Sequence, residues 1–185
     1  LLLQFKSIAD SDEEVATQLI ERGLLSDKIY ITIDLIRKQK ALDDFIDAID
    51  KDYAESYWQE WFKINKWILG SEYMEILDER RIKKPNGLKF WAETKDHDNY
   101  IPSSDLIKAI TQCQNYLYEI ERESNSAKFL ERTNETKIIK PRCMLVFGRS
   151  NDWSADKQKA FRMLNSMYIQ ISIMTYDHLL SRAKN

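Results

Sequence analysis

The chain has 185 residues, of which 43% are hydrophobic and 31% are charged, and its mean hydropathy is −0.54. This composition is that of a folded protein with ample material for an apolar core, which excludes a disordered, collagen-like or low-complexity chain. The formal net charge of −2 is nearly balanced, so any binding of nucleic acid must come from a local basic patch.

The sequence also favours a location away from membranes. No apolar run approaches the roughly 20 residues that a membrane-spanning helix needs. We recognise no signal peptide, and Cys113 and Cys143 are too few for a disulfide framework, so we expect a reducing, cytoplasmic location. The chain begins Leu1-Leu2-Leu3 instead of with methionine, so we expect that its numbering does not start where translation does.

The first predicted elements form a small N-terminal unit. Ser11 and Glu14 match the S-x-x-E pattern of a capping box and predict a short helix. Alternating isoleucines over residues 29–34 predict a strand, and apolar residues at helical spacing over 42–49 predict a helix. We therefore treat residues 1–49 as a regulatory or sensor appendage and residues 50–185 as the main domain.

The main domain opens with a helix over residues 58–69, whose aromatic stripe indicates a core face and for which Gly70 is the expected C-cap. Strands are predicted over residues 73–78 and 88–94, separated by a basic joint that contains proline and glycine at 80–87.

The second half of the main domain alternates helices and strands. This order predicts a mixed α/β layer structure. The predicted elements are a helix announced by residues 102–105 with an apolar face from Leu106 to Ile120, a strand over 142–147, a helix capped by Ser154, a strand over 169–173 and a final helix over 176–184.

Several enzyme classes lack their signature motifs here. The P-loop, the dinucleotide-binding glycine pattern, the zinc-protease pair of histidines and the nucleophile elbow are all absent. His97 and His178 lie beside acidic residues but far apart in sequence, which leaves a metal or base role open but is more typical of solvated or capping histidines.

A basic cluster precedes Pro85 and allows two interpretations. It could bind phosphates, whose neutralisation supplies most of the sequence-independent affinity for DNA, or it could be a solvated turn. Its members are Arg80, Arg81, Lys83 and Lys84.

Two further patterns also remain open on spacing alone. Glu93 and Lys95 are two residues apart and would share a strand face, although such E-x-K triplets often arise by chance in charged sequences. Gln112 and Tyr116 lie on one side of the predicted helix, where they either support a site or make ordinary hydrogen bonds.

Taken together, seven segments resemble a known family. They are residues 58–62, 67–70, 82–85, 104–112 with Tyr116, 147–150, 164–166 and 175–180. These segments resemble the C-terminal nuclease domain of Shedu anti-phage defence proteins over about residues 50–184. Shedu domains are similar to the PD-(D/E)XK nuclease superfamily, whose helical Q-x-x-x-Y element would fall on Gln112 and Tyr116.

The resemblance implies a restriction-endonuclease-like fold, in which helices flank a mixed central sheet, and metal-dependent cleavage of double-stranded DNA. In that superfamily an aspartate and the glutamate of an E-x-K motif bind Mg²⁺, or Mn²⁺ in its place, and the lysine orients the attacking water. The resemblance also implies a homo-oligomer.

The residues that the resemblance assigns follow from the matching motifs. Lys83 would be the catalytic lysine, with Gln112 and Tyr116 as its helical support. The candidate phosphate contacts are Arg80, Arg81 and Lys84.

The chain departs from the family pattern at the metal ligands, because Arg81 stands two residues before Lys83 where a glutamate is expected. Either Glu93-Thr94-Lys95 forms a displaced site with Asp78, or a stretch that carries the metal-binding acids is missing between Ile82 and Lys83.

We favour the missing stretch, because the motif on both sides is intact. The 4 glycines and 3 prolines are also fewer than an average chain of this length contains, as expected if loop residues are missing. Glu55 and Glu60 are weaker candidates for a second carboxylate near the metal. The rival hypothesis is a non-catalytic module, related to nucleases, that binds DNA or assembles without cutting.

Overall fold

The computed structural model describes residues 27–70, 85–124, 126, 130–131 and 140–184. The chain divides into two compact units, Leu1–Ala48 and Ile49–Asn185. The predicted capping box at Ser11 and Glu14 and the predicted strand over residues 73–78 lie outside the described residues. That the first unit is regulatory stays a prediction.

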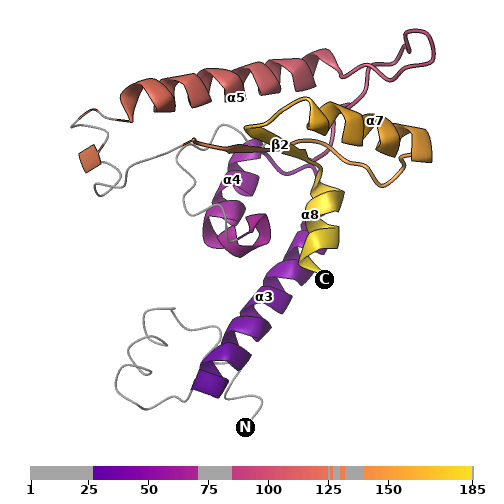
Figure 1. The fold of residues 1–185 in the computed structure, drawn as a ribbon. Helices are drawn as coiled ribbons and strands as arrows, with labels where there is room; N and C mark the ends of the chain where they lie inside the picture. Colours follow the sequence, from indigo (N-terminus) through magenta and orange to yellow (C-terminus); the bar gives the residue numbers. More distant parts are fainter. Residues whose placement is uncertain (1–26, 71–84, 125, 127–129, 132–139, 185) are drawn as a thin grey trace. The chain divides into compact units, whose positions relative to one another are not determined.

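The described helices and strands follow one another along the chain as shown in Figure 1. They are α3 (Asp27–Ile49), α4 (Glu55–Ile64), the 3₁₀-helix η1 (Lys66–Leu69), α5 (Ser104–Glu123), β1 (Cys143–Val146), α7 (Ala155–Ser166), β2 (Ile171–Met174) and α8 (Tyr176–Ala183).

The strand predicted over residues 29–34 is wrong, because this stretch is part of helix α3. Alternating isoleucines fit a strand face, but β-propensity depends strongly on context. Residues 27–49 contain no glycine or proline, and extending a helix costs far less than starting one. The ion pair of Lys38 Nζ with Asp34 Oδ2, at 2.7 Å and four residues apart, further suits the helix.

The sheet of the second unit is a parallel pair, in which Cys143 is opposite Ile171 and Val146 is opposite Met174. Parallel neighbours need a crossover connection, and α7 supplies it. The strands predicted over residues 142–147 and 169–173, and the helices between and after them, are thereby confirmed within a few residues.

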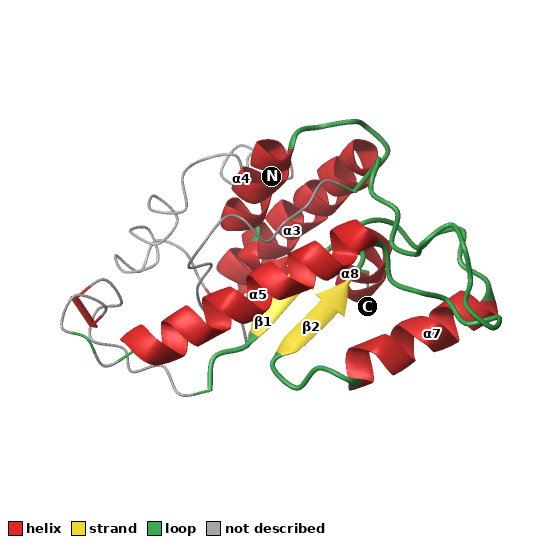
Figure 2. Ribbon diagram, turned by 90° about the horizontal axis from the view of Figure 1, so that it is seen from above, coloured by secondary structure: helices red, strands yellow, loops and turns green. Residues whose placement is uncertain are grey.

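Helix α5 lies across one face of this pair (Figure 2) and contributes five buried side chains to the main core. The Ser103 side chain begins the helix by accepting a hydrogen bond from the Leu106 amide at 3.1 Å, within the stretch 102–105 that predicted a helix start. The residues of α5 that face the core are Leu106, Ala109, Ile110, Cys113 and Leu117.

A second apolar cluster joins α4 and η1 to α8. The Trp58 ring meets the Tyr176 ring edge-on with centroids 4.8 Å apart, and Phe62 packs against the same tyrosine. Gly70 follows η1 with φ of 106°, a conformation that favours glycine, so its predicted role as a C-cap is confirmed. Together these contacts fix the start of α8 against the N-terminal part of the unit.

The strand predicted over residues 88–94 is wrong. This stretch is irregular and makes one antiparallel bridge, between Trp91 and Pro102. Hydrogen bonds flank the bridge, from the Ala92 amide to Ile101 and from the Ser103 amide to Phe90. The pairing does not continue beyond Ser103, because helix α5 begins at Ser104.

The fold prediction is therefore confirmed at the level of a mixed helix and strand structure. Within the described ranges the only sheet has two strands, and the larger central sheet of a restriction endonuclease stays a prediction. No helix in the described part of the chain is long and apolar enough to cross a membrane.

Candidate functional site

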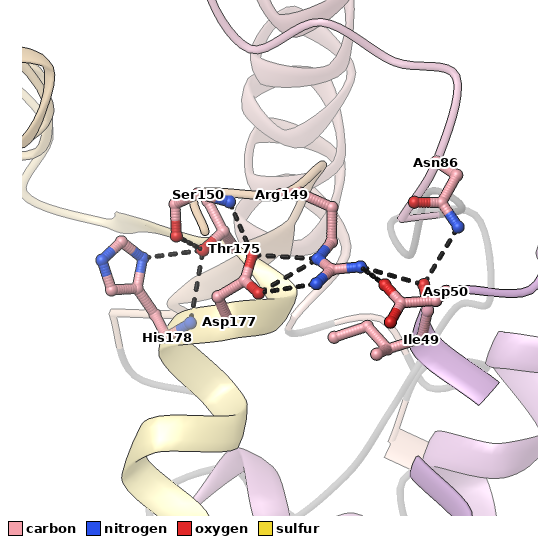
Figure 3. A network of polar contacts seen from close by, with 8 residues as sticks. All are labelled: Ile49, Asp50, Asn86, Arg149, Ser150, Thr175, Asp177 and His178. Atoms are coloured by element: carbon pink, nitrogen blue, oxygen red, sulfur yellow. Dashed lines mark hydrogen bonds and ion pairs between the residues drawn. The ribbon is translucent and has the colours of Figure 1, made fainter. Parts of the chain in front are cut away.

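Polar side chains gather where the two parallel strands end. The loop after β1 and the first turn of α8 after β2 meet at one edge of the sheet, together with residues from the start of the unit (Figure 3). We call this group the carboxyl-end network; its members are Ile49, Asp50, Asn86, Arg149, Ser150, Thr175, Asp177 and His178.

The backbone after β1 turns sharply to reach this position. Gly148 has φ of 61°, and a Cβ added there would lie 3.3 Å from the carbonyl oxygen of Leu88. The Gly148 carbonyl accepts a hydrogen bond from the Tyr176 amide at 3.1 Å. A larger residue would therefore be strained and crowded, which explains glycine at this point.

Arg149 is the centre of the network. Its Nε donates to both carboxylate oxygens of Asp177 at 3.0 Å, and its Nη1 donates to Asp50 Oδ1 at 2.6 Å and to the Ile49 carbonyl at 3.1 Å. Burial disfavours its charge, but the hydrogen bonds and charges of Asp177 and Asp50 outweigh burial and raise the pKa of the guanidinium. Arg149 is therefore a fixed cation whose hydrogen-bond donors are directed at protein groups.

Asp177 and Thr175 connect the β1 loop to the start of α8. The backbone amide of Ser150 donates to Asp177 Oδ2, and the Ser150 hydroxyl lies 2.6 Å from the Thr175 hydroxyl. Thr175 is fully buried, and its Oγ1 caps α8 by accepting from the His178 amide at 3.3 Å. Asp177 in the first turn also suits the positive end of the helix.

His178 extends the network into the aromatic core. Its Nδ1 lies 2.9 Å from Thr175 Oγ1, and its ring stacks on Phe161 with centroids 4.6 Å apart and planes at 12°. Burial lowers the pKa of the imidazole below 6.5, although the charge of Asp177 acts in the opposite direction. His178 is thus half-buried, stacked on Phe161 and in contact with the hydroxyl that caps α8, and it is not the solvated or capping histidine that the sequence predicts.

Asn86 attaches the segment after Pro85 to the same network. Its amide Nδ2 donates to the Ile49 carbonyl at 3.0 Å and to the Lys51 carbonyl at 3.2 Å. The Ile49 carbonyl therefore receives hydrogen bonds from both Asn86 and Arg149, as Figure 3 shows. Ile49 is the last residue of α3, where carbonyls lack partners within the helix.

The sequence-predicted site residues of the basic joint lie outside the described residues. This holds for the catalytic candidate Lys83 and the metal candidate Asp78, and for the phosphate candidates Arg80, Arg81 and Lys84. Their roles stay predictions. The nearest described residue is Pro85, which is buried.

The helical candidates Gln112 and Tyr116 both lie on α5. Gln112 is exposed and Tyr116 is half-buried, and both flank the buried stripe that includes Cys113. The spacing argument that puts them on one side of a helix holds, but their part in a site stays a prediction.

Of the metal candidates in the described part of the chain, Glu55 and Glu60 lie on α4, and Glu93 lies in the irregular stretch before α5. Glu55 begins α4, and its charge adds to burial in raising the pKa of Tyr176 well above its ordinary value. Glu60 is exposed beside Lys63, at 3.6 Å. Glu93 is exposed and forms an ion pair with Lys89, whose hydrogen bond lowers the pKa of the carboxyl.

Among the described residues, no group of three or more histidine, cysteine, aspartate or glutamate side chains is arranged to hold a metal ion. Mg²⁺ needs several oxygen ligands in near-octahedral geometry. The roles of Glu55, Glu60 and Glu93 as metal ligands stay predictions.

Sequence reasoning missed the carboxyl-end network, although a signal for it was present. Arg149 follows one predicted strand and Asp177 follows the next, and they have opposite charges. Because the carboxyl ends of parallel strands meet at one edge of a sheet, this pair could have been predicted to lie in contact. Asn86 had no such signal, since its partners are backbone carbonyls.

Together, the fold and the site define a mixed α/β domain in which a helical crossover joins two parallel strands and polar groups are fixed at their carboxyl ends. In open α/β sheets this edge is the usual place for a functional site. The sequence model of the Shedu protein SduA C-terminal family matches residues 52–180. The chain therefore belongs to the Shedu family, which confirms the resemblance predicted from the sequence. A comparison with curated proteins finds no match.

Proposed function

We propose that this protein is a metal-dependent DNA endonuclease or nickase that acts in bacterial antiviral and anti-plasmid defence. Family membership over residues 52–180 is the observation that carries the proposal, since it suggests a role in defence. The nuclease chemistry is inferred from the similarity of Shedu domains to the PD-(D/E)XK superfamily. The proposed substrate is double-stranded DNA, cut in the cytoplasm by a homo-oligomer.

Lys83 is the proposed catalytic residue. A lysine near the scissile phosphate can orient or help to deprotonate the attacking water, and its charge offsets the charge that develops in the transition state. Gln112 and Tyr116 are its proposed helical support, and Arg80, Arg81 and Lys84 are the proposed phosphate contacts.

The proposed cofactor is Mg²⁺ or Mn²⁺, and its ligands are proposed to be acids that precede Lys83. The acids are expected either in a stretch between Ile82 and Lys83 or at Asp78 with Glu93, because Arg81 stands where the family pattern has a glutamate. Hard carboxylate oxygens are the ligands that both ions prefer.

The test is a plasmid nicking assay on the full-length protein. Supercoiled plasmid is incubated with the protein and Mg²⁺, Mn²⁺ or EDTA, and the nicked and linear products are quantified. We expect cutting with either metal, none with EDTA, and a rate about 100-fold or more lower for Lys83→Ala. The control is Lys159→Ala, which removes an exposed lysine of α7 in the same unit and is expected to cut at the wild-type rate.

The outcomes separate the hypotheses. If the wild type shows no metal-dependent nicking but binds DNA, the protein is the non-catalytic binding module. If Lys83→Ala cuts as fast as the wild type, the nuclease assignment stands and the assignment of Lys83 is wrong.

A further inference from the structure

We propose that Ser150, Thr175 and His178 form a proton relay, in which hydrogen bonds carry a proton between the loop after β1 and a half-buried imidazole. The Ser150 hydroxyl oxygen is 2.6 Å from Thr175 Oγ1, which is 2.9 Å from His178 Nδ1 (Figure 3). These distances are those of hydrogen bonds. The relay is a property of the carboxyl-end network and does not depend on the proposed nuclease activity.

Thr175 gives the relay a direction, because it can donate only one hydrogen bond. A threonine hydroxyl has one hydrogen and two lone pairs. One lone pair accepts a hydrogen bond from the His178 amide, at 3.3 Å. Thr175 is fully buried, so its one hydrogen goes either to Ser150 Oγ or to His178 Nδ1. In the contact that does not receive this hydrogen, Thr175 is the acceptor.

When His178 is neutral, we assign its ring hydrogen to Nε2, which is the ordinary tautomer of a histidine in water. Nε2 has no hydrogen-bond partner in the described part of the chain, and the half-buried ring lets water accept from it. A hydrogen on Nδ1 would add a second donor at the positive end of α8. Nδ1 is therefore an acceptor, so that Thr175 donates to His178 and Ser150 donates to Thr175.

Protonation of His178 reverses the direction of the chain. The cation carries a hydrogen on both ring nitrogens, so Nδ1 becomes a donor to Thr175. The balanced step is one hop along the chain. Thr175 gives its hydrogen to Nδ1, Ser150 gives its hydrogen to Thr175, and Ser150 takes a proton from water. Each hydroxyl oxygen keeps one hydrogen, and the half-buried Ser150 then donates outward.

The packing around the imidazole makes the hydroxyl chain the route to Nδ1. The Phe161 ring stacks on the imidazole with centroids 4.6 Å apart, and the Trp153 ring meets it edge-on with centroids 6.0 Å apart. Nδ1 faces the Thr175 hydroxyl, which is fully buried. Because water does not reach Thr175, a proton arrives at Nδ1 through the hydroxyl of Ser150.

The charges of the network set the pH at which the relay takes up its proton. Burial lowers the pKa of His178 below 6.5, and the charge of Asp177 acts in the opposite direction. Arg149 lies beyond Asp177 and donates to both of its carboxylate oxygens at 3.0 Å. The relay is therefore in its neutral form at pH 7 and is protonated in mild acid.

The charged groups on the other elements around the ring have partners of their own. Lys157 lies one turn before Phe161 on α7, and its Nζ is 4.0 Å from an oxygen of Asp152. Arg182 lies one turn after His178 on α8 and donates to a backbone carbonyl, that of Leu69, at 3.2 Å. These cations disfavour a charged imidazole in the same direction as burial does.

The experiment is a pH titration of the full chain by NMR, with ¹⁵N in its 2 histidines. The ring nitrogens report which of them carries a hydrogen and the pH at which each histidine titrates. The variant His97→Gln assigns the signals. We expect neutral His178 to carry its hydrogen on Nε2.

Ser150→Ala tests the relay directly. In the charged state this variant leaves the Thr175 hydrogen without an acceptor, whereas in the neutral state Thr175 loses only one of its two donors. Because a buried donor without a partner costs more than an under-used acceptor, the titration midpoint of His178 should fall by about 0.5 or more on the pH scale. The Ser150 amide still donates to Asp177, so the backbone of the loop is retained.

The matched control is Ser172→Ala, which removes an exposed serine of β2 outside the relay and should leave the midpoint of His178 unchanged. His97, whose side chain is 91% exposed, should titrate alike in every variant that retains it. Thr175→Ser keeps the hydroxyl, so adding Ser150→Ala to it should again lower the midpoint of His178. Thr175→Val removes the hydroxyl, so adding Ser150→Ala to it should change nothing.

Two results would overturn the relay. One is a neutral His178 that carries its hydrogen on Nδ1, since water would then protonate Nε2 without the hydroxyl chain. The other is an unchanged midpoint of His178 in Ser150→Ala. If Thr175→Val does not fold, because it removes the cap of α8, the comparison in Thr175→Ser still decides between these outcomes.

Discussion

The second unit contains two regions that are held together by different forces. The apolar core between α5 and the strand pair depends on the removal of side chains such as Leu106 and Leu145 from water, which is not directional. The carboxyl-end network depends on donors and acceptors at fixed distances around Arg149. Changes in the core should therefore affect stability, and changes in the network should affect local geometry as well.

The two regions also differ in how they tolerate substitution. A core position accepts another apolar residue of similar volume at small cost. A partly buried network position accepts very few substitutions, because loss of one hydrogen-bond partner leaves the other partly buried and unpaired. The strand ends join the regions, since Phe147 belongs to the core and Arg149, two residues later, to the network.

The largest effect is expected in the core. Leu145→Ala removes a side chain that is 1% exposed in β1, and we expect the free energy of unfolding to fall by about 2–5 kcal/mol. Urea unfolding measures this change. The control Ile169→Ala removes an isoleucine that is 92% exposed and should change the free energy of unfolding by less than about 0.5 kcal/mol. If Leu145→Ala and Ile169→Ala lowered the free energy of unfolding equally, the core would not lie where the structure places it.

An intermediate effect is expected in the network. Asp177→Ala removes both acceptors of Arg149 Nε and the acceptor of the Ser150 amide, while the Arg149 side chain is only 17% exposed. We expect the free energy of unfolding to fall by about 2–3 kcal/mol, because a buried charge loses its main partner.

The control for this prediction is Asp50→Ala. Asp50 also pairs with Arg149, at 2.6 Å, but its side chain is 79% exposed, so water can replace it and the loss should stay below about 1 kcal/mol. If urea unfolding finds the two variants equally destabilised, burial does not control the energetics of the network.

The core was largely predictable from the sequence. Apolar spacing predicted α5 with its buried stripe and alternation predicted β2, because burial of one face imposes a period on the sequence. The strand β1 was predicted without alternation, from a short apolar segment that ends at Gly148. The same rule failed for residues 29–34, where alternation was present but a continuous helix without breakers was more favourable.

The candidate site was much less predictable. Contacts such as Asn86 with the Ile49 carbonyl join residues 37 apart in sequence, and the donors and acceptors are common groups that carry no periodic signal. The proposal that Lys83 is catalytic is based on the family motif. A motif indicates which residue type stands at a position, but not how far its side chain lies from the group on which it acts. Resemblance therefore supplied the proposed chemistry, and the structure supplied the contacts among the described residues.

The smallest expected effect is on the pH dependence of stability. It concerns His178, which contacts Thr175 of the network and Phe161 of the aromatic core, so the contributions of the two regions to its pKa can be compared. Burial against Phe161 lowers the pKa of its imidazole below 6.5 in the folded state. As the pH falls below 6.5, the unfolded chain binds a proton that the folded chain does not yet bind, so the free energy of unfolding falls until the folded pKa is reached. Above 6.5 this contribution is constant.

His178→Gln should flatten this part of the profile, measured by urea unfolding between pH 5 and 8, whereas His97→Gln, which removes a histidine whose side chain is 91% exposed, should retain it. Asp177 sets the size of the effect, since its charge partly offsets burial. In Asp177→Ala the pKa of His178 should therefore fall further and the loss of stability should extend to lower pH. A profile that is unchanged in Asp177→Ala would mean that burial in the aromatic core alone sets the pKa of His178, and that the network has no electrostatic influence on it.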